Sequence, residues 1–172
     1  MMLRRAWSGL VGPLGAARSA GVVGAATAAG LVAGTETAAR CGPGVGAFVG
    51  VTAVDLVGGM VAFQLRPTRE HYARTSLSRR MALAAAHVQC FALPIVGEGA
   101  WSVAAGRWAG VVASTALLQC AVPAEHRRPA GLVLAAGLTA ADVALAGPRQ
   151  RWLGPVWFTK LVAGHATLPD PR

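Results

Sequence analysis

The apolar run from Pro43 to Leu65 most constrains this chain, because it is long enough to cross a lipid bilayer. A membrane-spanning helix needs about 20 mainly apolar residues. Asp55 is the only charged residue within the run, and Arg66 follows directly after its end. We therefore expect a transmembrane helix over residues 43–65.

Further apolar runs lie on both sides of this one. Charged residues make up only 13% of the 172 residues, whereas a soluble domain carries about a quarter. So few charges cannot cover a water-soluble globule. The sequence therefore predicts an all-α fold, a transmembrane helix bundle of about five spans, or four if the first run does not span. The expected spans are 19–35, 43–65, 81–98, 103–122 and 130–147.

Three regions follow along this single domain: a short basic segment over 1–18, the bundle over 19–147 and a tail over 148–172. The first region begins like a signal peptide, but Arg18 interrupts its apolar part. We therefore expect an uncleaved first span rather than a removed leader.

The tail combines aromatic and basic side chains in a segment too short and too charged to span. Trp152 and Trp157 lie beside Arg151 and Lys160, a mixture typical of the membrane–water interface. We expect a C-terminal interfacial helix, which lies on the membrane surface or dips back toward the bundle.

The net charge of +9 comes from basic residues that fall between the apolar runs. This placement follows the positive-inside rule and argues against nucleic-acid binding, which needs a basic face. The loop 66–80 is the most basic and should be cytoplasmic, although the basic tail runs against the rule. The alanine-, glycine- and arginine-rich composition favours a bacterial protein of the cell membrane.

Small residues recur every four positions along the run 43–65. The stripe consists of Gly42, Gly46, Gly50 and Gly58, with Val54 at the missing position. Such a face allows a neighbouring helix to approach closely. We expect this neighbour to be another helix of the same chain, and a second copy of the chain is the alternative.

Ionisable residues within the spans form the candidate site. A charge in hydrocarbon is costly and should face the bundle interior. Asp55 should therefore meet His87 or Gln89 of the next span, and Asp142 should meet Lys160 or His165 of the tail. This predicted polar cluster is Asp55, His87, Gln89, Asp142, Lys160 and His165.

The cluster has two readings, a proton, ion or small-ligand site or a set of polar pairs that hold helices in register. No nucleophilic triad, zinc pattern or phosphate loop is present in the sequence. The three cysteines form no C-x-x-C pair. We expect no catalytic residues, no metal and no cofactor, and a protein that is not an enzyme.

Several stretches resemble, in order, a group of uncharacterised bacterial polytopic membrane proteins. They are DLVGGMVAFQLRPTREHYAR, AAHVQCFALP, VPAEHRRPAG and WLGPVWFTKLVAGH, within about residues 50–166. The pattern is an Asp-x-x-Gly-Gly element, a basic loop, a histidine in the next helix and a Lys-Leu…His tail. Gln64 departs from it, since an asparagine is expected nearby. The resemblance implies membrane topology and places these residues on the pattern: Asp55, Gly58, Gly59, His87, Arg128, Pro129, Asp142, Lys160 and His165.

Three functions fit these observations. The first is an integral membrane protein, in contact with lipid, that binds or moves a small solute or a proton through the polar cluster. The second is an accessory subunit whose partner docks on the loop 66–80, and association with another copy or another subunit stays open. The third is a membrane enzyme acting on a lipid or quinone.

Overall fold

The computed structural model describes residues 2–170, with side chains from residue 5 onward, and this part of the chain is helical without any strand. Pro43 starts one helix directly after Gly42, whose φ of 90° lets the preceding helix reverse within one residue. The helical segments are α1 Met2–Val11, α2 Ala16–Cys41, α3 Pro43–Ala62, α4 Arg66–Ala73, α5 Leu77–Ala86, η1 Gln89–Phe91, α6 Ala92–Ile95, α7 Trp101–Cys120, α8 Arg127–Leu145, η2 Pro148–Gln150, α9 Leu153–Phe158 and η3 Thr159–His165.

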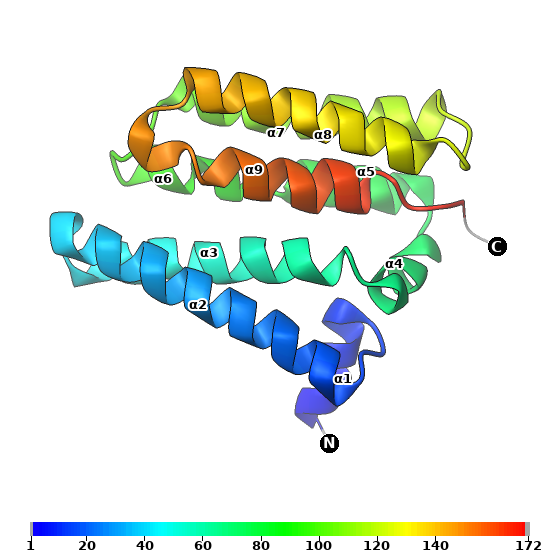
Figure 1. Ribbon diagram of the computed structural model, residues 1–172, viewed down its shortest axis with the longest axis horizontal. Helices are drawn as coiled ribbons and strands as arrows, with labels where there is room; N and C mark the ends of the chain where they lie inside the picture. The colour runs from blue at the N-terminus through cyan, green and yellow to red at the C-terminus, as the bar shows by residue number, and fades with distance from the viewer. Residues whose placement is uncertain (1, 171–172) are drawn as a thin grey trace.

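The long helices lie side by side along the length of the molecule (Figure 1). Helix α2 is at the outer edge and packs against α3. Helices α7 and α8 form the opposite side, and α5 and α9 lie between them and α3. Helix α2 diverges from α3 toward its N-terminal end, where α1 is placed (Figure 1). Buried Val11, Val22 and Ala62 fill this corner.

Three helices within residues 2–170 are long and apolar enough to cross a membrane: α2, α3 and α8. The predicted count of five spans is therefore not confirmed. Helix α7 has 20 residues but is not among the three. The run expected to span over 81–98 is broken, because α5 ends at Ala86 and only η1 and α6 follow.

The break has a local cause at each end. The His87 ring donates from Nδ1 to the Leu83 carbonyl at 2.6 Å, so a side chain caps the last turn of α5. Further on, Pro94 has no N–H to donate to a preceding turn. The apolar character of 81–98 is correct, but its continuity as one helix is wrong.

The C-terminal tail forms part of the core and does not lie as a helix on the surface of the molecule. Leu153, Trp157 and Leu161 are fully buried, and they pack with buried residues of α3, α5 and α7. A helix that is apolar all round is buried rather than placed at a surface. Of the two expected positions, the tail takes the one folded back into the bundle, so 19–147 and 148–172 share one core.

The tail also runs the length of the molecule. Arg149, at its start, contacts Glu98 at one end of the bundle. Leu168 accepts hydrogen bonds from Arg80 and Arg127 at the other end. α9 and η3 therefore make an additional lengthwise pass through the protein.

Candidate functional site

An ion pair between α3 and η3 is the centre of the candidate site. Lys160 Nζ lies 2.8 Å from Asp55 Oδ2, and the two side chains are 4% and 51% exposed. Gln89 Nε2 donates to the same Asp55 oxygen at 3.1 Å. Asp55 Oδ1 accepts no hydrogen bond from the described residues. The ammonium is therefore buried, while one carboxylate oxygen stays open.

Gly58 and Gly59 allow close contacts on two different faces of α3. A Cβ at Gly59 would lie 3.0 Å from Lys160 Nζ and closer still to Lys160 Cε. A Cβ at Gly58 would lie 3.2 Å from the Ala26 Cβ of α2. The glycine pair thus lets Lys160 cross α3 on one face and α2 approach on the other.

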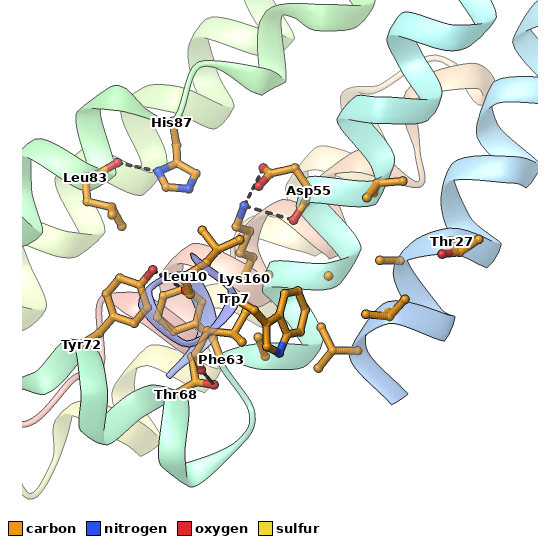
Figure 2. Close-up of a pocket in the computed structure, with 18 residues that line it drawn as sticks. Trp7, Leu10, Thr27, Asp55, Phe63, Thr68, Tyr72, Leu83, His87 and Lys160 are labelled. Atoms are coloured by element: carbon orange, nitrogen blue, oxygen red, sulfur yellow. Dashed lines mark hydrogen bonds and ion pairs between the residues drawn. The ribbon is translucent and has the colours of Figure 1, made fainter. Parts of the chain in front are cut away.

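His87 faces the ion pair without bonding to it (Figure 2). Because a carbonyl only accepts, the bond to Leu83 places the hydrogen of a neutral ring on Nδ1. Nε2 then carries a lone pair and contacts no donor among the described residues. The expected Asp55 partner is thus Gln89 rather than His87, and the strongest partner is Lys160.

A cavity of about 400 Å³ opens over these groups (Figure 2). Asp55, Lys160 and His87 supply its charged and basic lining, and apolar side chains form most of the rest. Six helical segments contribute to the lining. Trp7 comes from α1, Val23 from α2, Asp55 from α3, Tyr72 from α4, Leu83 from α5 and Lys160 from η3. This volume lies within the roughly 300–1,000 Å³ of small-molecule sites.

Helix α4 holds α1 at the mouth of this cavity. Thr68 Oγ1 donates to the Val11 carbonyl at 2.6 Å, and Tyr72 donates to the Leu10 carbonyl at 2.7 Å. These are last-turn carbonyls of α1, which lack partners within their own helix. Burial raises the pKa of Tyr72, so its hydroxyl keeps the proton that it donates.

Irregular backbone surrounds the ion pair on both sides. η3 is a π-helix, in which the Ala166 N–H donates to the Leu161 carbonyl, and Lys160 lies near its start. On the other side is the break between α5 and η1, with His87 and Gln89. π-Helical turns occur frequently at functional sites, and broken helices within membranes line cavities.

Asp142 lies in a separate site, so its predicted pairing with Lys160 or His165 is wrong. Arg107 donates to both Asp142 oxygens, at 2.7 and 2.9 Å, and to the Gln150 carbonyl at 3.0 Å. Both side chains are almost fully buried. Arg107 lies within an apolar run, and a buried charge requires a partner. This pair was not predicted from the sequence.

His165 is buried beside the site but does not line the cavity. Its ring packs edge-on against Phe63, with centroids 5.7 Å apart. Its Nδ1 has no hydrogen-bond partner in the described part of the chain. The structure therefore brings Asp55, Gln89 and Lys160 into contact and places His87 opposite them. His165 lies outside the cavity.

Four arginines enclose the end of the tail, and the sequence analysis missed this arrangement. Arg69 donates to the Gly164 and Thr167 carbonyls, and Arg80 to those of Leu168 and Pro169. The other two come from α8, where Arg127 contacts Asp170 and Arg128 donates to the Ala163 carbonyl. Arg69 and Arg80 of the loop 66–80 therefore face inward and are not free to bind a partner.

Three of the four stripe glycines lie against α2. A Cβ at Gly50 would come within 2.9 Å of the Gly30 carbonyl, and one at Gly46 within 2.5 Å of the Gly34 carbonyl. Gly58 faces Ala26 as described above. Gly42 is different, because a Cβ there would meet nothing within 4 Å. It belongs to the turn between α2 and α3.

No group of three or more His, Cys, Asp or Glu side chains in the described residues is arranged to hold a metal ion. Cys41, Cys90 and Cys120 are all free thiols. Comparison with protein-family models, curated proteins and solved structures finds no match to the chain.

Proposed function

We propose that this chain is a multi-pass protein of the cell membrane that binds a small, largely apolar molecule in the cavity over Asp55 and Lys160. One observation carries the proposal: a buried lysine forms an ion pair at the polar end of a largely apolar cavity. Such a combination of apolar lining and few convergent polar groups is typical of ligand sites.

A purely structural pair accounts less well for these groups. Asp55 is 51% exposed, although a carboxylate that only joined two helices would gain from complete enclosure by its partners. The His87 ring also lines the cavity, although its other contact is an edge-on packing against Trp157 of α9. Charged groups within membrane segments mark functional sites by default.

The orientation belongs to the same proposal. The loop 66–80 lies on the cytoplasmic side, and the residues near Leu168, held by Arg80, lie on that side too. Lys160 is buried in the ion pair, so its charge is left out when basic residues of the loops are counted for the positive-inside rule. A Ser78→Cys variant lacking Cys41 and the exposed Cys120 should resist an impermeant thiol reagent in intact cells and react after lysis. Ready labelling of intact cells would reverse the orientation.

The binding proposal is tested with 2-bromo-4-hexylphenol, whose bromine quenches a nearby tryptophan. Trp7 lines the cavity, so titration of the protein in phosphatidylcholine nanodiscs should quench its emission saturably. The saturable part should disappear in Trp7→Phe, which shows that the probe reaches this cavity.

Filling the cavity provides the matched control. Val54 lines the cavity, whereas Val51, three residues earlier on α3, does not and is 70% exposed. Val54→Phe should abolish saturable quenching, and Val51→Phe should leave it intact. Quenching that rises linearly in the parent protein and never saturates would refute the proposed function. Equal binding by the two variants would refute it as well.

A further inference from the structure

The free hydrogen-bonding groups at the polar end of the cavity restrict the chemistry of its ligand. Asp55 Oδ2 already accepts from Lys160 at 2.8 Å and from Gln89 at 3.1 Å. Oδ1 of the same carboxylate has no donor within the described chain. The neutral His87 ring presents a second acceptor, because its only hydrogen lies on the Nδ1 that faces Leu83.

Two unfilled acceptors on different helices therefore face one space. Asp55 comes from α3, and His87 follows the end of α5, with the cavity between them (Figure 2). A ligand that covers these acceptors without donating to them leaves each one buried and unpaired, at a cost of about 1–3 kcal/mol. A ligand that donates hydrogen bonds avoids this cost.

The charges at this end exclude ionised heads of either sign. Asp55 and Lys160 compensate each other, so the pair has no net charge to neutralise a third ion. A carboxylate or phosphate would lie against the open oxygen of Asp55, and an ammonium beside that oxygen would lie close to Lys160. Like charges that are in contact or nearly so repel strongly in a medium of low dielectric constant.

The remaining lining selects the body of the ligand. Val23, Ala26 and Val54 are apolar, as are Leu83 and Phe63. Burial of apolar surface contributes about 25 cal/mol per Å², so a hydrocarbon body supplies most of the affinity. The hydroxyl supplies orientation.

From these observations we infer that the ligand is an uncharged molecule with a hydroxyl group on an apolar body. Its hydroxyl donates to Asp55 Oδ1 or to His87 Nε2. This inference rests on the proposed function, since it specifies the ligand of the same cavity. Binding of this ligand forms and breaks no covalent bond and only exchanges hydrogen bonds.

Three probes with one body and different heads separate the possibilities. They are 2-bromo-4-hexylphenol, its methyl ether and the corresponding bromo-hexylbenzoate, compared by saturable Trp7 quenching below neutral pH, where the phenol keeps its proton. The phenol should bind at least about tenfold more tightly than the ether, because only the phenol can donate a hydrogen bond to an ionised acceptor. The benzoate should bind more weakly than the phenol as well.

Two acceptor variants add a second test. Asp55→Asn should lower phenol affinity by about tenfold or more and should leave ether affinity nearly unchanged, since only the phenol uses the carboxylate. His87→Leu should likewise lower the affinity for the phenol more than the affinity for the ether, so that the two affinities become more similar. Should a variant fail to fold, the comparison of heads on the parent protein still decides.

The outcomes distinguish this inference from the proposed function. If the ether or the benzoate binds as tightly as the phenol, and Val54→Phe still abolishes binding, the cavity is a ligand site but the hydroxyl class is wrong. If none of the three probes quenches saturably, the proposed function fails and this inference fails with it.

Discussion

Gly59 lies directly against the side chain of Lys160, so that a Cβ at this glycine would be only 3.0 Å from the ammonium nitrogen. The ion pair with Asp55 therefore depends on a missing side chain one turn further along α3. Helix α3 contributes both the carboxylate and the gap through which its partner reaches it.

Gly59→Ala tests this dependence. The added methyl should push the end of Lys160 away from Asp55, while the fold persists because a flexible side chain can yield. We expect probe affinity to fall by about tenfold, similar to the loss of one charged hydrogen bond. Gly44→Ala is the matched control on α3, since a Cβ there meets nothing within 4 Å. Equal affinity in both variants would separate Gly59 from the site.

The pair between Arg107 and Asp142 should contribute to stability rather than to binding. Asp142→Leu leaves the guanidinium buried without its partner and should cost about 3–5 kcal/mol of folding free energy. Arg107→Met together with Asp142→Leu should recover much of this loss, because no unpaired charge remains. Thermal unfolding in detergent measures both, and a double variant less stable than the single one would contradict the assignment.

The contact between α2 and α3 leaves no room for a side chain at Gly50. Gly50→Leu should force the two helices apart, because even a Cβ would lie 2.9 Å from the Gly30 carbonyl. Folded yield in membranes should fall sharply. Val51→Leu places the same side chain on the neighbouring exposed position and should accumulate like the parent. Matching yields would remove the close-packing argument.

Glu98 should make stability depend on pH at the end of the molecule away from the loop 66–80. The hydrogen bond from the Cys41 thiol lowers its pKa, and Arg149 and Arg40 lower it further. Its contribution is therefore complete above the ordinary glutamate value of about 4.3 and is lost as the pH falls through the lower folded pKa.

Glu98→Gln should remove this part of the acid dependence and flatten the stability profile in that range. Melting temperatures measured in steps of pH, for the parent and the variant, give the comparison. Glu125→Gln is the control, since Glu125 is highly exposed and its nearest cation is the adjacent His126. A parent profile that coincides with the Glu98→Gln profile would contradict the role of Glu98.

The helical class and the contact of Asp55 with Gln89 could be predicted from the sequence, because charge is scarce and costly in apolar runs. Periodicity could not distinguish the buried tail from an interfacial helix, since Trp157 and Lys160 suit either place. Tertiary packing decides between the two, and it buries Leu153, Gly154, Trp157 and Phe158 of α9.

Partner choice was the least predictable part of the site. Asp55 and Lys160 are 105 residues apart, and any basic group within reach would satisfy the carboxylate. Asp142 illustrates the same limit, because the sequence offered Lys160 and His165 while the fold presents Arg107. A stronger signal was available there: an arginine inside a run requires an acid on a facing helix.

The position of a bound probe tests the central claim most directly. We predict that crystals grown with 2-bromo-4-hexylphenol show an anomalous bromine peak in the cavity between α2 and α5, with the hydroxyl within hydrogen-bonding distance of Asp55 or His87. Lys160 should remain paired with Asp55 in the same crystals. A bromine peak outside this cavity, or a Lys160 side chain directed away from Asp55, would contradict the account.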